Sequence, residues 1–399
     1  MSRIQEELHV DSTRPLRVAM VGIGFMGAAH SQGWRVAPRF FELARPIEMA
    51  LLAGRNEERT TEAAEKWGWS ETTTDWRTVL DRDDIDIVDI VTPGDTHGEI
   101  AIAALEAGKH VLCEKPLANS VAEAKRMTEA AERAATAGVR SMVGFTYRRV
   151  PAVAFARQLV ASGVLGDIRQ VRANYLQDWL INPEAPLTWR LQKDLAGSGA
   201  LGDIGAHAID LSQYILGETV DSVSGMLETF VSERPLLSNS VGLGGTASSE
   251  RGTVTVDDLA LFTARFSGGA VGSFEASRFS TGRKNAFRIE IAGSSGALSF
   301  DLEDMNVLEV YDATAPAGRQ GFTRVVVTEP EHPYMKNWWP TGHMIGYEHG
   351  FSHQAKDFVD AITSGLNPSP SFADGLQVQC TLDAVERSAA AGSRWTPVG

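Results

Sequence analysis

Short apolar runs alternate with amphipathic stretches along the first 145 residues of the chain. The apolar runs have the length of buried β-strands and occupy residues 16–21, 47–52, 85–91, 110–113 and 139–145. The stretches between them predict helices at residues 28–34, 57–67, 99–107 and 120–138. Strands separated by helices of this length are typical of a parallel, doubly wound sheet, the α/β Rossmann arrangement.

Residue types at the helix ends support this alternation. Gly108 directly follows the third helical stretch, where glycine commonly ends a helix. Ser120 and Glu123 lie three residues apart before the fourth stretch, which is the spacing of a capping box.

The pattern changes after Pro151. Helices are predicted at residues 152–162 and 203–216, with strand character at 167–179 and a loop at 180–198. Alternating segments joined by short turns predict strands at residues 259–266, 270–277, 287–292, 297–300 and 307–311, and closing helices at 352–362 and 374–388. The second half is therefore expected to be α+β, with a large, mainly antiparallel open sheet.

Residues 238–252 interrupt this second pattern, because glycine and serine dominate them. Such a composition is typical of a flexible loop, which can be a lid over a site or a solvated connection. We expect a solvated connection.

A glycine-rich turn, Gly22-Ile23-Gly24-Phe25-Met26-Gly27, joins the first strand to the first helix. In this context the G-x-G-x-x-G spacing is typical of dinucleotide binding. Gly22 allows the tight turn, Gly24 lets a pyrophosphate approach the backbone, and Gly27 lets the helix pack on the strand. The helix N-terminus, with Phe25 and Met26, would face the phosphates.

Residues that follow two other predicted strands should line the same crevice. Ligands of a doubly wound sheet bind outside the carboxyl ends of its strands. Thr92 and Pro93 follow the strand at 85–91, and Lys115 follows the strand at 110–113. A lysine there can contact cofactor or substrate, and this interpretation is favoured over the alternative of a solvated surface lysine.

The end of the second strand bears on the choice of cofactor. Sites for NAD usually hold the ribose hydroxyls with an acidic residue at this point. The chain instead has Gly54-Arg55-Asn56, with Arg59 farther on. An arginine can meet the 2′-phosphate of NADP(H), so we favour NADP(H). The alternative is that Arg55 only stacks on the adenine.

Asp203 and His207 lie four residues apart in a predicted helix, so both side chains should project from one face. A carboxylate beside a histidine raises the basicity of the imidazole, as a general base requires. A salt-bridge pair on the surface of an amphipathic helix would show the same spacing. The apolar positions Ile204, Ala208 and Leu211 provide a separate face for packing.

Composition excludes several classes of partner. Lysine and arginine number 37 against 51 acidic residues, a net charge of −14, which argues against nucleic acid or an anionic membrane surface. Apolar runs stay short of the roughly 20 residues of a membrane span, and residues 1–15 lack the apolar segment of a signal peptide. The two cysteines, Cys113 and Cys380, are expected to be reduced and buried, which suits a cytoplasmic protein.

Histidines and tryptophans gather near the C-terminus. His349 and His353 have a spacing that can hold a metal, but no carboxylate or cysteine partner is evident, so we expect no metal site. Trp338 and Trp339 are better suited to stacking on a sugar or to a subunit contact.

Taken together, these segments resemble the glucose–fructose oxidoreductase/inositol dehydrogenase (Gfo/Idh/MocA) family. The resemblance runs from about Leu16 to the C-terminus. Its most specific parts are residues 22–27, Glu114-Lys115-Pro116, Trp189-Arg190 and residues 199–210. It implies a Rossmann domain at residues 1–146 that binds NAD(P), and a substrate-binding and oligomerisation domain at 147–399. Homodimers or homotetramers built on the sheet face would follow.

The resemblance also implies a role for particular residues. Lys115, Asp203 and His207 match the catalytic residues: a lysine beside the nicotinamide and the reacting oxygen, an acid/base histidine, and its carboxylate companion. Further cofactor contacts are implied for His97, Glu114, Trp189 and Arg190, and further substrate contacts for Arg148 and Gln177. Thr146, where many relatives have asparagine, and Arg55, where NAD-preferring relatives have an acidic residue, depart from the family pattern.

The expected function is hydride transfer between nicotinamide and a secondary alcohol of a sugar, anhydrosugar or cyclitol. His207 would remove the hydroxyl proton, and Lys115 would stabilise negative charge on the same oxygen. Two alternatives remain open. Some members of the family keep NAD bound and cleave glycosidic bonds without net oxidation, and others bind a dinucleotide without catalysis. Retention of both Lys115 and His207 argues against the second.

Overall fold

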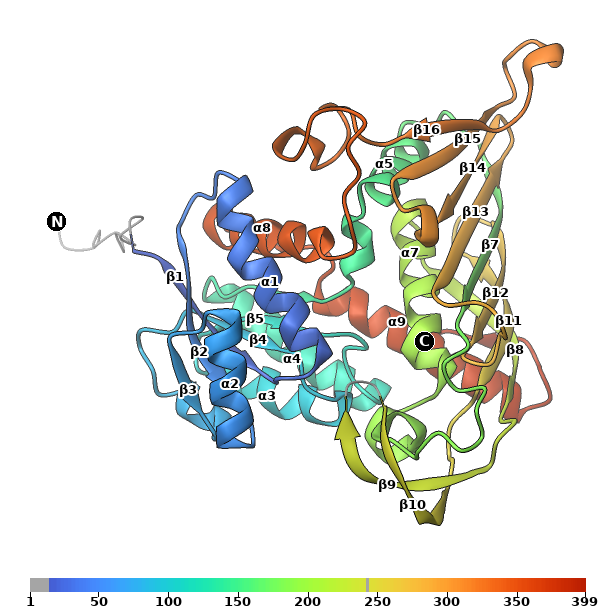
Figure 1. The fold of residues 1–399 in the computed structure, drawn as a ribbon. Coiled ribbons are helices and arrows are strands. Elements are labelled where there is room, and N and C mark those ends of the chain that lie inside the picture. Colours follow the sequence, from blue (N-terminus) through green and yellow to red (C-terminus); the bar gives the residue numbers. More distant parts are fainter. Residues whose placement is uncertain (1–13, 242–243) are drawn as a thin grey trace, which may run out of the picture.

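The computed structural model describes residues 14–241 and 244–399 of the 399-residue chain (Figure 1). The expectation about a signal peptide therefore lies almost wholly outside the described residues. Over the described residues, no helix is long and apolar enough to cross a membrane. Cys113 and Cys380 are free and buried, as predicted.

The N-terminal part is a six-stranded parallel sheet with the strand order β3-β2-β1-β4-β5-β6. Its strands are β1 Leu16–Val21, β2 Ile47–Ala53, β3 Glu71–Thr73, β4 Ile87–Ile90, β5 His110–Cys113 and β6 Ser141–Val143. The helices that connect them are α1 Phe25–Phe40, α2 Glu57–Trp67, α3 His97–Glu106 and α4 Val121–Thr136. This order is that of a doubly wound dinucleotide-binding sheet, so the prediction for this half is confirmed.

Alternating strand residues build two apolar layers against this sheet. Val18, Met20 and Leu52 face one layer, while Ala19 and Val21 face the other. The first layer is completed by the late helix α8 (His349–Ser364), which lies beside α1 although it is more than 300 residues away in sequence (Figure 1). The predicted domain boundary between residues 146 and 147 stays a prediction. Helix α8 packs on the N-terminal sheet although it follows this boundary in the sequence.

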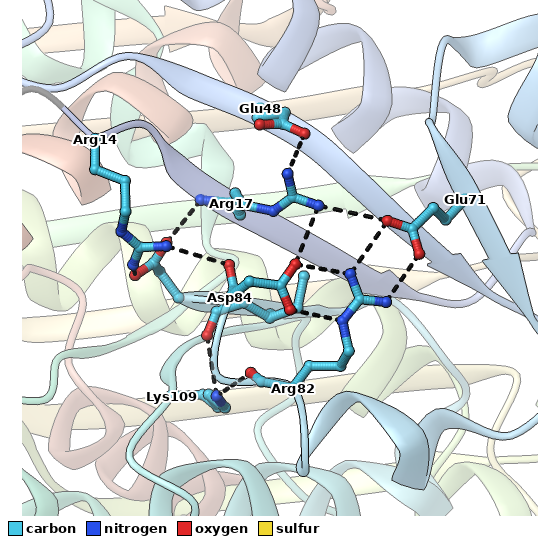
Figure 2. Close-up of polar contacts among 9 residues, drawn as sticks. Arg14, Arg17, Glu48, Glu71, Arg82, Asp84 and Lys109 are labelled. Atoms are coloured by element: carbon cyan, nitrogen blue, oxygen red, sulfur yellow. Dashed lines mark hydrogen bonds and ion pairs between the residues drawn. The ribbon is translucent and has the colours of Figure 1, made fainter.

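Charged residues gather where the strands of this sheet begin, at the edge opposite the carboxyl ends (Figure 2). Arg17 of β1 contacts Glu48 and Asp84, at 2.5 and 3.2 Å. Arg82 contacts Glu71 at 2.8 Å and forms a bidentate pair with Asp84. Hydrogen bonds from Arg82 lower the pKa of Asp84 to about 2. These ion pairs connect neighbouring strands at the amino ends of the sheet. Ligands of such a sheet bind at the opposite edge, outside the carboxyl ends of the strands.

The C-terminal part is built on a nine-stranded sheet with the order β16-β15-β14-β13-β7-β12-β11-β8-β17. Its strands are β7 Ile168–Leu176, β8 Val220–Glu228, β11 Leu259–Phe266, β12 Val271–Ser277, β13 Ala286–Gly293, β14 Gly296–Asp301, β15 Val307–Asp312, β16 Thr323–Val326 and β17 Thr396–Pro397. Only the β7–β12 pair is parallel among the described strands of this sheet. Helices α5 Pro151–Ala161, α7 Ala206–Leu216 and α9 Phe372–Ala390 cover one face (Figure 1). The predicted mainly antiparallel sheet is confirmed.

Three local predictions differ from the structure. The segment expected to be a solvated loop contains a hairpin of β9 (Glu233–Val241) and β10 (Gly244–Thr253), so the prediction of an irregular loop was wrong. Helix α1 runs to Phe40, past the predicted end. Ser120 caps α4 by accepting from Glu123 N, but the Glu123 carboxylate accepts from Asn119 N, so the reciprocal half of the capping box is absent.

Candidate active site

A cavity of about 860 Å³ lies at the carboxyl edge of the parallel sheet and extends to α7 and β7 of the second sheet. Most of the predicted site residues line it: Gly22, Gly24, Phe25, Met26, Arg55, Thr92, Pro93, His97, Glu114, Lys115, Gln177, Trp189, Arg190, Asp203 and His207. Two predicted residues, Gly27 and Arg148, do not line it. The structure thus brings the glycine turn and the Lys115–Asp203–His207 group to one cavity.

The glycine turn fits a pyrophosphate. Gly22 has a φ of +121°, and a Cβ there would lie 2.8 Å from the carbonyl oxygen of Val91. A Cβ on Gly24 would meet nothing within 4 Å, which leaves open space over the start of α1. No side chain caps that helix end, so its first N–H groups are available to an anion. Gly27 acts beneath the site, because a Cβ there would lie 2.7 Å from Gly22 O.

At the end of β2 the cavity is lined by Gly54, Arg55, Asn56 and Arg59, without a carboxylate among these four. Asn56 is used as the N-cap of α2, where its side chain accepts from Arg59 N. The side chains of Arg55 and Arg59 are exposed. This end therefore presents positive charge to whatever occupies it.

Lys115 follows β5 and reaches across the cavity to the second part of the chain. Its Nζ donates to the carbonyl oxygen of Asp203 at 2.7 Å and lies 3.6 Å from the Asp203 carboxylate. The Arg278 guanidinium lies 3.6 Å from the same carboxylate. Burial opposes ionisation of Asp203, but Lys115, Arg278 and Arg190 together hold its pKa below the usual value.

The backbone around Asp203 differs from the predicted α-helix. Residues Leu201–Gly205 form a π-helical turn, and α7 begins only at Ala206. The buried carboxylate of Asp257 receives the N–H groups of Gly199 and Leu201, at 2.7 and 2.8 Å, and so fixes the start of the turn. A Cβ on Gly199 would lie 1.7 Å from Asp257 O, which explains why glycine stands there.

The expected pairing of Asp203 with His207 is not formed. His207 is buried, and its Nδ1 has no hydrogen-bond partner among the described residues. Burial and then the charge of Lys115 place the pKa of His207 well below its usual value, whereas we expected a neighbouring carboxylate to raise it. The free protein therefore holds a neutral imidazole there, which is the form that can take up a proton.

Five side chains beside His207 form a hydrogen-bonded chain whose polarity is fixed. Trp179 Nε1, a donor only, donates to Gln177 Oε1 at 2.9 Å, and Gln177 Nε2 donates to Asn285 Oδ1 at 2.8 Å. Tyr175 donates to the same Oδ1 at 2.7 Å, so its oxygen accepts from Tyr147, 2.9 Å away. The Tyr147 oxygen is therefore left as an acceptor for a ligand.

The sequence contains a partial signal for these hydrogen-bonded side chains. Tyr175, Gln177 and Trp179 alternate along β7 and its continuation, so they share one face. Asn285 precedes β13 and has no local signal. Arg278, buried directly after β12, was also missed, because its contact with Asp203 joins segments far apart in the chain.

Arg148, expected to contact the substrate, belongs to the protein interior. Its guanidinium forms a bidentate pair with Asp210, with a shortest distance of 2.6 Å, and donates to Ser369 Oγ at 3.0 Å. It also contacts Asp374 at 3.3 Å and lies over the ring of Tyr214. The substrate contact of Arg148 stays a prediction that this geometry does not support. The sequence cannot show that Asp210 turns inward.

The histidines near the C-terminus have structural partners. His353 Nδ1 contacts Arg149 O at 2.8 Å, and its Nε2 accepts from Trp338 Nε1 at 2.7 Å. His349 Nδ1 accepts from Gly346 N. Within residues 14–241 and 244–399, no group of three or more His, Cys, Asp or Glu side chains could hold a metal. Trp338 and Trp339 do not line the cavity, so they do not stack on a sugar there.

Comparison with known proteins places this geometry in a family. Residues 16–145 match the oxidoreductase family with an NAD-binding Rossmann fold, and residues 153–299 match the GFO/IDH/MocA C-terminal domain. The chain belongs to the Gfo/Idh/MocA family. The predicted family, enzyme class and function, an NAD(P)-dependent oxidoreductase acting on a sugar or cyclitol, are confirmed.

Individual relatives in this family match nearly the whole chain. Levoglucosan dehydrogenase of Pseudarthrobacter phenanthrenivorans is 45% identical over 96% of this chain and 98% of its own. A crystal structure of an oxidoreductase domain protein from Kribbella flavida is 60% identical, with a TM-score of 0.92 over 97% of this chain and 100% of its own. Levoglucosan dehydrogenase in complex with NADH and levoglucosan is 43% identical, with a TM-score of 0.90 over 96% and 99%.

Proposed function

We propose that this protein oxidises a secondary alcohol of levoglucosan, or of a closely similar anhydrosugar or pyranose, with a nicotinamide dinucleotide as acceptor. The carrying observation is the meeting of Lys115, Asp203 and a neutral His207 in the cavity that contains the glycine turn. The resemblance to an enzyme whose structure holds NADH and levoglucosan narrows the substrate class.

In this proposal each side chain of the group has a separate role. His207 accepts the hydroxyl proton of the substrate, because its imidazole is neutral and buried. Lys115 stabilises negative charge on the same oxygen with an ammonium held in place by Asp203 O. Asp203 balances the charges of Lys115 and Arg278 and offers its carboxylate to a second hydroxyl. The bound nicotinamide supplies the hydride acceptor.

The dinucleotide would lie along the parallel sheet. The turn at Gly22 and Gly24 would hold the pyrophosphate. Phe25, Met26, Thr92, Pro93, His97, Glu114, Trp189 and Arg190 line the same cavity and would contact the rest of the cofactor. Gly27 would support the cofactor site by packing beneath the turn. Gln177 would support the substrate site through its hydrogen bonds to Trp179 and Asn285. Arg148 is not proposed as a substrate contact, because it does not line the cavity.

For the cofactor, we favour NADP(H) over NAD(H). The support is the exposed Arg55 and Arg59 at the end of β2, with no acidic residue among the lining residues there. Titrating the protein with NADPH and NADH, together with an Arg55→Asp variant, tests this preference. We expect tighter NADPH binding that the substitution reverses. Tighter NADH binding by the unsubstituted protein would overturn the preference.

The decisive assay of function is reduction of NAD and NADP, followed by absorbance, with levoglucosan, glucose, myo-inositol and scyllo-inositol. We expect turnover with levoglucosan or a related pyranose. Absence of turnover with every substrate, combined with a dinucleotide released on denaturation, would favour redox-neutral glycoside cleavage instead.

We also propose a homodimer or homotetramer built on the open face of the nine-stranded sheet. Light scattering measures the mass in solution, and the mass of a monomer would contradict this proposal.

A further inference from the structure

A histidine outside the proposed catalytic group lies between two buried carboxylates. His30, on α1, places Nδ1 2.9 Å from Asp89 Oδ2 and Nε2 3.0 Å from Glu114 Oε1. The exposed fractions are 2% for His30, 0% for Asp89 and 4% for Glu114. Trp34 Nε1 donates to Asp89 Oδ2 at 2.7 Å. The three ionisable groups belong to α1, to β4 and to the segment after β5.

The contacts of His30 indicate its protonation state. Each ring nitrogen faces a carboxylate oxygen, and an ionised carboxylate accepts hydrogen bonds but cannot donate them. Both ring nitrogens therefore carry hydrogen, and the ring is an imidazolium. Burial alone lowers the pKa of His30, but Asp89 and then Glu114 outweigh burial and raise it to about 10. The trio then carries one net negative charge in place of the two that its carboxylates would carry alone.

Glu114 connects this trio to the cavity. Its Oε1 accepts from His30, and its Oε2 accepts from the backbone N–H of Lys115 at 3.1 Å. A Cβ on Gly144 would lie 2.6 Å from Glu114 Oε1, so glycine keeps room for the carboxylate. Phe351 packs on the His30 ring, with centroids 5.3 Å apart, and both Glu114 and Phe351 line the cavity.

We propose that His30 is a positioning residue that holds the Glu114 carboxylate in place beside Lys115, so that the cavity presents a fixed carboxylate there. Without the imidazolium, two buried carboxylates would lie on either side of an uncharged side chain, and Glu114 Oε1 would lose the cation that holds it. If the nicotinamide lies beside Lys115, as the proposed function has it, this carboxylate favours the positively charged oxidised ring over the reduced ring.

The first test is spectroscopic and needs no cofactor. Nitrogen NMR of the protein labelled with ¹⁵N-histidine should show an imidazolium signal that persists at pH 9 and is absent from His30→Gln. The matched control is His110→Gln, because His110 is only partly buried, and burial and then Arg140 lower its pKa to about 4. A His30 ring that is neutral at pH 8 would overturn the proposal.

The second test measures dissociation constants for oxidised and reduced dinucleotide between pH 6 and 9. In the unsubstituted protein the preference for the oxidised form should be nearly constant over this range, whereas in His30→Gln it should change by about tenfold. His110→Gln should show no such change, because it leaves His30, Asp89 and Glu114 intact. An equal, pH-independent preference in folded His30→Gln refutes the proposal.

The two tests separate this proposal from the proposed function. If the protein binds neither dinucleotide, the function fails while the NMR measurement still decides the state of His30. If His30→Gln does not fold, Asp89→Asn serves in its place. It removes one of the two carboxylates, so the imidazolium signal should disappear at a lower pH than in the unsubstituted protein, and an unchanged titration would count against the proposal.

Discussion

Replacing Arg148 by methionine removes the cation of a buried ion pair and leaves the carboxylate behind. Asp210 is fully buried and Arg148 is 5% exposed, and two guanidinium nitrogens bind the carboxylate at 2.6–3.1 Å. Burial already raises the pKa of Asp210, and only the arginines oppose it strongly. The variant must therefore either bury an unpaired charge or protonate Asp210.

The expected loss follows from this geometry. Breaking a buried ion pair by removing one partner costs about 3–5 kcal/mol. The double variant Arg148→Met with Asp210→Leu should lose less, because it buries no orphaned charge. Arg172→Met serves as a control, because Arg172 and Glu290 form an exposed ion pair. Its free energy of unfolding should fall by less than about 1 kcal/mol.

Guanidinium unfolding followed by tryptophan fluorescence measures these losses, and steady-state kinetics on the folded fraction measures KM. We expect a large loss of stability for Arg148→Met with KM nearly unchanged. A loss of stability below 1 kcal/mol together with a tenfold rise in KM would refute the reasoning. It would return Arg148 to the substrate contact that the sequence suggested.

Three further predictions concern the site and its acid stability. Lys115→Ala and His207→Ala should each lower kcat by about 10²–10⁴, and less than tenfold in both would contradict their roles. Tyr175→Phe removes the acceptor that orients the Tyr147 hydroxyl, so KM for the substrate should rise roughly fivefold, the worth of one hydrogen bond, and an unchanged KM argues against a contact at Tyr147. The lowered pKa of His110 stabilises the fold above pH 6.5, and this contribution is lost as the pH falls to about 4. The unfolding free energy of His110→Gln should therefore fall less between pH 7 and 4, and an equal fall would contradict this assignment.

The parallel sheet could be predicted closely because its signals are local. Buried strands of a doubly wound sheet are continuous apolar runs, and the glycine spacing reports a turn that only glycine can make. The strand that was missed, β3, has three residues, Glu71 to Thr73, none of them buried. An edge strand of this kind carries no hydrophobic periodicity. Pro38 lies in the last turn of α1, and the sequence could not show that packing continues the helix past it.

The errors in the second half come from contacts between distant segments. The hairpin of β9 and β10 is rich in glycine and serine, but Leu236 joins a small apolar cluster with Leu187, which no local pattern reveals. The side chain of Asp203 meets Lys115, 88 residues earlier, and Arg278, 75 residues later. Helical spacing correctly placed Asp203 and His207 at one cavity, yet the partner of each carboxylate and each ring depends on tertiary structure.

The π-helical turn at Leu201–Gly205 determines how α7, which directly follows it, is rotated about its axis. The wider turn holds one more residue than an α-helical turn, and it presents the carbonyl of Asp203 to the Lys115 ammonium. Deleting one residue from this segment would restore an α-helical turn and rotate α7 by about 100°. We expect that His207 would then leave the cavity, although Lys115 and His207 both remained in the sequence. The position of His207 therefore depends on the length of this segment as well as on the identity of its residues.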